Sequence, residues 1–168
     1  DSGDIITRDY FPIDHNTKIT EVWGWMRHRI PELMLSAVSS LSADPNYYLE
    51  RQSISIHDAH RCYPRIPEDG HINFSRSALS VLRLINASNK AYSGAYCQYE
   101  GRKLIIWDAA LVEDDELFSA VPGHVTKVCK DYVEVACGVG KLRINLVEYD
   151  GQVKTPSSFI HSIRKRLI

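Results

Sequence analysis

Apolar residues recur at three- and four-residue steps along the first quarter of the chain. Such spacing places their side chains on one face of an α-helix, with Thr17 as the expected N-cap. Pro31 lies inside the pattern and predicts a kink or a break. Trp23 and Trp25 are two residues apart, so one of them is expected to be partly exposed. The apolar positions are Ile19, Val22, Trp23, Met26, Ile30, Leu33, Met34, Ala37 and Leu41.

Weaker patterns flank this helix. Residues 5–13 are rich in β-favouring types and predict a strand that ends near Pro12. The alternation of isoleucine and serine over 53–56 predicts a second, short strand. Ser75 is the expected N-cap of a second helix that ends near Ser88. One strand and one long helix cannot bury both of their faces, so the first part predicts an incomplete domain.

From residue 92 onward the pattern becomes that of an all-β domain. Strands are expected over 95–99, 103–109, 125–128, 132–137 and 142–147, with a tight turn at Glu100-Gly101 and glycines at the corners. Five short strands of this kind predict a small, open β-barrel of the OB-like class. Residues 157–168 are expected to form a terminal helix with Phe159, Ile160, Ile163 and Leu167 facing inward.

Composition narrows the function classes. The 168 residues are 44% hydrophobic and 24% charged with a net charge of −1, as in a soluble globular protein. The general basic surface of a nucleic-acid binder is missing. The four cysteines have no Cys-x-x-Cys spacing, which favours reduced thiols and a cytoplasmic location. No apolar run approaches the ~20 residues that span a membrane, so no membrane partner is expected.

Few motifs carry chemistry. His57, His60 and Cys62 match no structural zinc pattern, so no metal is predicted. Gly138-Val139-Gly140 lacks the helix of a dinucleotide site and is interpreted as a β-corner. The loop from Tyr63 to Gly70 remains, where Arg65 offers planar donors suited to phosphate or carboxylate and Asp69 offers acceptors. A surface loop of salt bridges is the alternative interpretation.

Several stretches, in order along the chain, resemble the N10-formyltetrahydrofolate-dependent formyltransferase family, which includes sugar N-formyltransferases and methionyl-tRNA formyltransferases. Asp1-Ser2-Gly3-Asp4-Ile5 matches its Asp-x-Gly-x-Ile stretch. The run from Arg65 to Phe74 matches its Arg-x-Pro-Glu-Asp-Gly-x-Ile-x-Trp connector, with Phe74 in place of Trp. Tyr92-Ser93-Gly94-Ala95-Tyr96 resembles its Tyr-Pro-Gly-Ala-aromatic turn. The resemblance extends through Lys103–Trp107, Val121–Val125 and Val135–Gly140, and so covers nearly the whole chain.

The resemblance implies the end of a Rossmann-like formyltransferase domain followed by the barrel: residues 1–60 in the catalytic domain, 61–90 as connector loop and helix, and 91–168 as barrel with terminal helix. It implies N10-formyltetrahydrofolate as cofactor and a catalytic Asn, His and Asp. Asp1 matches the Asp, and the Asn-x-His pair is expected upstream. In such a site the His transfers protons, the Asn stabilises the oxyanion and the Asp orients the His. This chain alone is expected to be inactive.

The resemblance to sugar-type members implies that the connector loop contributes to the acceptor pocket, with Arg65, Asp69 and Tyr92 as the expected substrate-binding residues. The connector wording Arg-x-Pro-Glu-Asp-Gly, the near-neutral charge and the short barrel favour a nucleotide-linked amino sugar, as in lipopolysaccharide or O-antigen biosynthesis. Methionyl-tRNA is the alternative acceptor, although a tRNA partner would be expected to bring a wider basic surface. A third interpretation is an inactive barrel that serves as a binding or dimerisation module. A homodimer is a further expectation.

Overall fold

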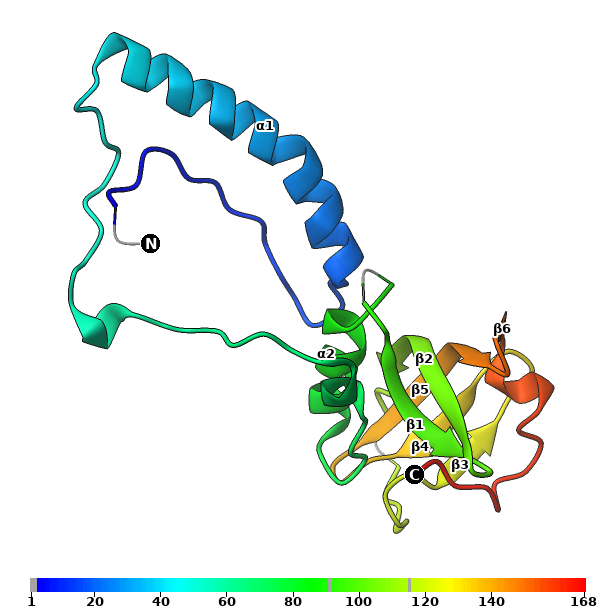
Figure 1. The fold of residues 1–168 in the computed structure, drawn as a ribbon. Coiled ribbons are helices and arrows are strands. Elements are labelled where there is room, and N and C mark those ends of the chain that lie inside the picture. Colours follow the sequence, from blue (N-terminus) through cyan, green and yellow to red (C-terminus); the bar gives the residue numbers. More distant parts are fainter. Residues whose placement is uncertain (1–2, 91, 115) are drawn as a thin grey trace. The chain divides into compact units, whose positions relative to one another are not determined.

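The structure, a computed structural model, describes residues 3–90, 92–114 and 116–168 (Figure 1). The chain divides into two compact units. Unit 1 comprises Asp1–Pro12 and Glu21–Arg65, and unit 2 comprises Ile13–Thr20 and Ile66–Ile168. Among the described helices, none is long and apolar enough to cross a membrane.

Unit 1 consists of the body of helix α1 (Ile19–Ala43) and extended chain. The strand predicted over 5–13 is reduced to a single bridge between Ile5 and Glu50, and the strand predicted near Ile54 is replaced by the 3₁₀ turn η1 (Ile56–Asp58). Neither segment has a neighbouring strand of the described chain to extend its pairing. The Rossmann-like assignment of this part stays a prediction.

Helix α1 runs through Pro31 without a break, curving along its length in Figure 1. None of its residues is buried. The predicted apolar face is largely open, with Ile30 53% and Met34 65% exposed. Trp23 is 43% exposed and Trp25, which contacts Phe11, is half-buried, as expected for two tryptophans so spaced. Residues 1–65 therefore contain a helix whose apolar side chains the described part of unit 1 does not cover.

Unit 2 is built on one antiparallel sheet. Its strands are β1 (Ala95–Tyr99), β2 (Arg102–Leu111), β3 (Val125–Val128), β4 (Val133–Ala136), β5 (Lys141–Tyr149) and β6 (Gln152–Lys154). The hydrogen-bonded order is β1-β2-β5-β4-β3, with β6 paired to β5. The five predicted strands are confirmed and β6 was not foreseen. The strand ladder is open, and the OB-like assignment is not established by it.

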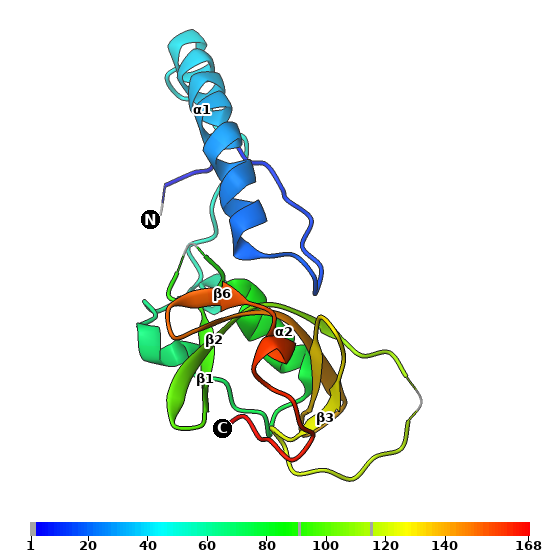
Figure 2. The same cartoon turned by 90° about the vertical axis from the view of Figure 1, so that its right-hand side faces the viewer.

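Helix α2 (Ala78–Ala87) packs against β2 and β5, and its apolar face joins the core of unit 2 (Figure 2). Its N-cap is Ser77, which accepts a hydrogen bond from the backbone N–H of Ser80 (3.2 Å), two residues later than predicted. Leu82, Ile85, Leu104, Ile106 and Ile144 are fully buried between the helix and the sheet.

The predicted C-terminal helix is wrong. Only Pro156–Ser158 forms a 3₁₀ turn (η3), and the chain beyond it contains a turn at residues 163–164 but no helix. The last residues instead hydrogen-bond to both edges of the sheet. On the β3 side, the backbone N–H of Val125 donates to Lys165 O and that of Leu167 donates to Gly123 O, and on the β1 side Ile168 exchanges two backbone bonds with Gln98. Unpaired N–H and C=O groups of edge strands supply this pairing, which the helical periodicity of the segment does not reveal.

Candidate functional site

Asp1, the predicted catalytic residue, lies outside the described residues. The chain just after it is held by residues 50–52. The backbone N–H of Gln52 donates to Asp4 Oδ1 (3.2 Å), Ile5 bridges Glu50, and Arg8 forms an ion pair with the Glu50 carboxylate. These contacts fix the backbone of the Asp-x-Gly-x-Ile stretch from Asp4 onward.

The predicted connector forms a compact turn. Arg65 is exposed and is the last residue of unit 1. Asp69 belongs to the 3₁₀ turn η2 (Pro67–Gly70) in unit 2, and its Oδ2 accepts a hydrogen bond from the backbone N–H of Ile66 (2.9 Å). Since that oxygen caps the turn, Asp69 has a structural role that the sequence did not indicate.

Tyr92 lies on the neighbouring turn of unit 2. A Cβ atom on Gly70 would stand 2.7 Å from the carbonyl oxygen of Gly94, so the turn that carries Asp69 packs directly against the one that carries Tyr92. The Tyr92 side chain is 55% exposed, and its backbone N–H donates to Asn89 O (2.7 Å). Of the predicted substrate residues, the structure brings together the turns of Asp69 and Tyr92.

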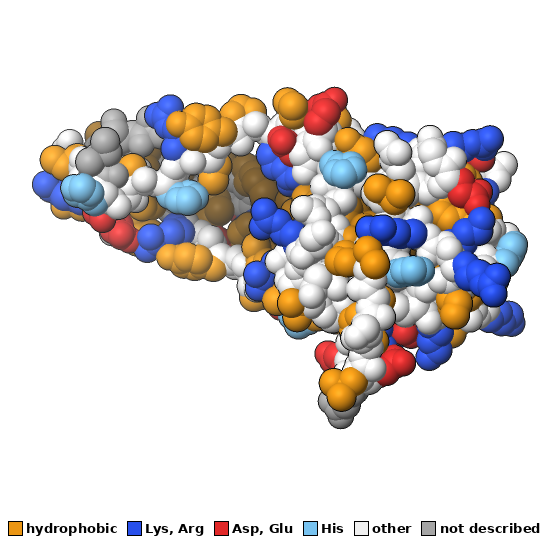
Figure 3. All heavy atoms as spheres, turned by 90° about the horizontal axis from the view of Figure 1, so that it is seen from below, with side chains coloured by type: hydrophobic (Ala, Val, Ile, Leu, Met, Phe, Trp, Pro, Cys, Tyr) orange, Lys and Arg blue, Asp and Glu red, His pale blue; other side chains and the backbone are white. Residues whose placement is uncertain are grey.

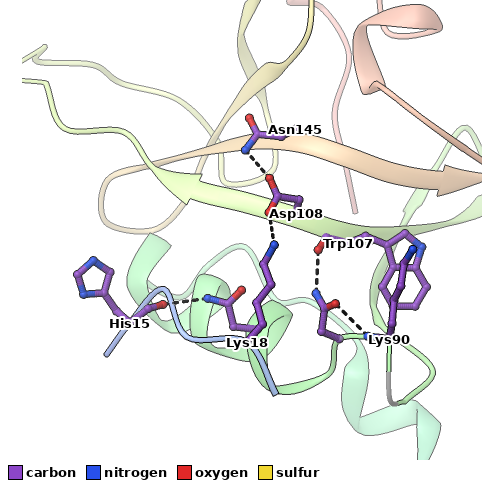
Figure 4. Close-up of polar contacts among 8 residues, drawn as sticks. His15, Lys18, Lys90, Trp107, Asp108 and Asn145 are labelled. Carbon is purple, nitrogen blue, oxygen red and sulfur yellow. Dashed lines mark hydrogen bonds and ion pairs between the residues drawn. The ribbon is translucent and has the colours of Figure 1, made fainter. Parts of the chain in front are cut away.

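The Tyr92 turn depends on glycine and on a tryptophan beneath it. Gly94 has φ +80, and a Cβ there would lie 2.3 Å from Ile105 Cγ2 and 2.9 Å from the Trp107 ring. Trp107 donates from Nε1 to Glu148 Oε2 (3.1 Å) and accepts at its carbonyl from Asn89 Nδ2 (2.8 Å; Figure 4). The motif residues Gly94 and Trp107 thus support the turn.

A polar cluster that sequence reasoning missed lies on unit 2. Lys18 forms an ion pair with Asp108, and Asn145 Nδ2 donates to Asp108 Oδ2 (2.7 Å; Figure 4). Asn86 Nδ2 donates to the carbonyl oxygen of His15 (2.9 Å). One signal was available: Asp108 is the only acid in the apolar run of β2.

The described residues contain neither a disulfide nor a cluster of metal-ligating side chains. No group of three or more His, Cys, Asp or Glu side chains stands close enough to hold a metal ion within 3–90, 92–114 and 116–168. All four cysteines are free. Burial raises the pKa of the Cys97 and Cys137 thiols to about 12, so both stay protonated at neutral pH and fill the core.

The sheet with its packed helix and the paired turns define a small antiparallel β domain covered by one helix. The family described as "Formyl transferase, C-terminal domain" matches residues 65–164. The chain therefore belongs to the formyl transferase family and contains its C-terminal domain.

Two relatives illustrate the match. A methionyl-tRNA formyltransferase of Acetivibrio thermocellus is 40% identical over 81 residues, which cover 48% of this chain and 25% of that protein. One of Clostridium tetani is 26% identical over 151 residues, covering 89% and 46%. The chain spans less than half the length of these curated relatives.

The fold also matches solved structures. A crystal structure of HypX from Aquifex aeolicus in complex with tetrahydrofolic acid has a TM-score of 0.63 and 18% identity, covering 94% of this chain and 27% of that chain. Another HypX structure gives a TM-score of 0.66 at 17% identity. At such identity the likeness concerns the fold alone.

Proposed function

We propose that the protein to which this chain belongs transfers a formyl group from N10-formyltetrahydrofolate to the amino group of methionyl-tRNA. The observation that carries this function is the family match over 65–164 together with relatives that are methionyl-tRNA formyltransferases. The crystal structure of HypX with tetrahydrofolic acid supports a folate donor by analogy of fold. A cytoplasmic location stays a prediction.

The reaction needs a group that carries a proton and a hydrogen-bond donor that stabilises the oxyanion. The acceptor amine attacks the formyl carbon, the tetrahedral intermediate collapses, N10 of tetrahydrofolate leaves with the bonding electron pair, and the proton lost by the amine goes to N10. Asp1 would orient and charge-balance a histidine that moves this proton. Tyr92, exposed beside the connector turn, and Arg65 are the residues proposed to meet the acceptor.

The surface is compatible with a nucleic acid held by few phosphate contacts. Lys, Arg and His side chains are spread over the right-hand part of the surface in Figure 3, among apolar ones. Arg76, Lys103 and Arg166 of unit 2 are exposed. With a net charge of −1, a salt dependence shallower than that of a general nucleic-acid binder is expected.

An amino-sugar acceptor is the second candidate, favoured by the connector Arg65–Gly70 and the near-neutral charge. The relatives above support methionyl-tRNA instead. A binding or dimerisation module without activity is the third.

Turnover of the full-length protein separates these candidates. With N10-formyltetrahydrofolate, formyl transfer to methionyl-tRNA is expected. Transfer to nucleotide-linked amino sugars alone would overturn the tRNA acceptor, and no transfer to either would leave the binding module. Asp1→Asn is expected to lower kcat by ~100-fold or more, whereas Asp44→Asn, at an exposed acid beyond the end of α1, serves as the matched control.

A further inference from the structure

Residues 13–20, named here the anchor segment, fold with unit 2 although the chain on both sides of them belongs to unit 1. The segment follows the stretch that begins with Asp1 and runs into the first residues of α1. Its fastening to unit 2 therefore acts on a piece of chain that is covalently continuous with the proposed catalytic stretch.

An ion pair provides the first fastening (Figure 4). The Lys18 ammonium contacts Asp108 Oδ1, and the other carboxylate oxygen accepts from Asn145 Nδ2 (2.7 Å). The side chains of Lys18 and Asp108 are 29% and 33% exposed. Because the pair is partly shielded from water, its attraction is screened less than that of a fully exposed pair.

The buried side-chain amide of Asn86 provides the second contact that fastens the anchor segment. Asn86 of α2 is only 3% exposed, and its Nδ2 donates to the carbonyl oxygen of His15 (2.9 Å). Its Oδ1 has no partner in the described part of the chain. Release of the anchor segment would take away the Nδ2 partner as well, and a buried amide with neither group paired is costly. Helix α2 therefore favours the docked segment.

Strand β2 is deformed at the residue that holds Lys18. Its pairing with β5 shifts register on both sides of Asp108. Such bulges bend a strand and re-aim a side chain. The strand otherwise consists mainly of apolar residues such as Leu104 and Ile106 that pack in the core. Asp108 at this irregular position, held by the hydrogen bond from Asn145 on the neighbouring strand, is therefore placed to pair with Lys18.

We propose that Lys18, Asp108 and Asn86 are positioning residues for formyl transfer. They hold the anchor segment on the C-terminal domain without touching the reactants, and this segment is covalently continuous with the Asp1 stretch on one side and with α1 on the other. This role rests on the function proposed above. Misplacement of a reacting group by a fraction of an ångström lowers the rate of the chemical step more than it weakens binding of the donor.

The test uses the full-length protein with Lys18→Met, which keeps the aliphatic stem, and Lys18→Arg, which keeps the charge. Amide hydrogen exchange of 13–20 is expected to become at least threefold faster in Lys18→Met. Its kcat is expected to fall five- to tenfold while KM for the formyl donor stays within twofold. Lys18→Arg is expected to restore both values to within twofold of the wild type.

Arg102→Met is the matched control, because it breaks the ion pair with Asp150 elsewhere on the same sheet. It should change neither exchange of 13–20 nor kcat. Unchanged exchange in Lys18→Met would overturn the fastening, and faster exchange with kcat within twofold would overturn the positioning role. If the wild-type protein transfers no formyl group, the proposed function itself is refuted. This outcome is distinguishable because the wild type is assayed before any variant.

Discussion

Gly138 and Gly101 of unit 2 differ in what a methyl group would meet. A Cβ on Gly138 would lie 2.0 Å from the carbonyl oxygen of Ser75, although its φ is one that any residue adopts. Gly101 faces open space, but its φ of +76 is in the left-handed region. The first glycine is required by contact with another chain segment, the second by its own backbone.

Alanine at these positions should therefore have different costs. Gly138→Ala forces the backbone near Ser75 to move, so a loss of ~2–3 kcal/mol in the free energy of unfolding is expected. Gly101→Ala should lose about 1 kcal/mol, the cost of a left-handed residue. Urea unfolding of both variants measures the difference. Equal losses would contradict the close contact at Gly138.

Lys141 is a buried cation with exposed partners. Its side chain is 2% exposed and forms ion pairs with Asp114 (2.7 Å) and Glu116, and its Nζ stands 5.5 Å from the Phe118 ring centroid. The hydrogen bond from Lys141 lowers the pKa of the Asp114 carboxyl below its ordinary value. The hydrogen bond to Asp114, and after it the one to Glu116, raises the pKa of Lys141 above its ordinary value.

These pKa shifts make the free energy of unfolding depend on pH. A carboxyl whose pKa is lower in the folded protein contributes stability above its unfolded pKa of about 3.9 and loses it as the pH falls through the folded value. Wild type should therefore lose more stability than Lys141→Met between about pH 5 and pH 2. Urea unfolding across this range measures it. Lys130→Met, at an exposed lysine, should follow the wild type; parallel curves for all three would exclude the effect.

At the scale of elements, the strands were predictable and the chain end was not. Alternating β-favouring residues and corner glycines mark β1 to β5, and the positive φ of Glu100 and Gly101 fits the predicted tight turn. The end of the chain has the spacing of a helix, yet Ile163 is 58% exposed while Leu167 is buried. Pairing with the open edges of the sheet determines the conformation of this segment, and the local sequence does not reveal which strands are edges.

The candidate site was predictable to a similar extent. The motifs located the connector and the Tyr92 turn, because glycines such as Gly70 and Gly94 mark close backbone approach. The pair Lys18–Asp108 had no local pattern, since 90 residues separate its members. The capping of η2 by Asp69 is not visible in the sequence, because a carboxylate that caps a turn and one that binds a ligand are the same residue type.

The final segment offers an element-scale test. Leu167 is 1% exposed and its backbone N–H donates to Gly123 O (2.8 Å), whereas the Ile168 side chain is 69% exposed. Leu167→Ala should lower the free energy of unfolding by ~2–4 kcal/mol, and Ile168→Ala by less than about 0.5 kcal/mol. Chemical denaturation compares them. A Leu167→Ala loss as small as that of Ile168→Ala would mean that the segment does not complete the core.

At the scale of the whole chain, the buried core belongs to unit 2. Every residue of the core cluster lies between Ile72 and Leu167, and no residue of α1 is buried. A unit without a buried helix face contributes little apolar burial, which is the main favourable term in folding. In unit 1, Ile30, Met34 and Val38 on α1 are all exposed.

Calorimetry of the isolated 168-residue chain tests whether the cooperatively folded core is confined to unit 2. At roughly 0.7 kcal/mol per residue near 60 °C, cooperative unfolding of unit 2 alone predicts an enthalpy of about 80 kcal/mol, against about 120 kcal/mol for the whole chain. The lower value is expected, because α1 has no core to lose when the sheet unfolds. The full-length protein is the control: there a covered α1 should show slow hydrogen exchange, whereas in the isolated chain its amides should exchange early. An enthalpy near the higher value would show that unit 1 unfolds together with the sheet.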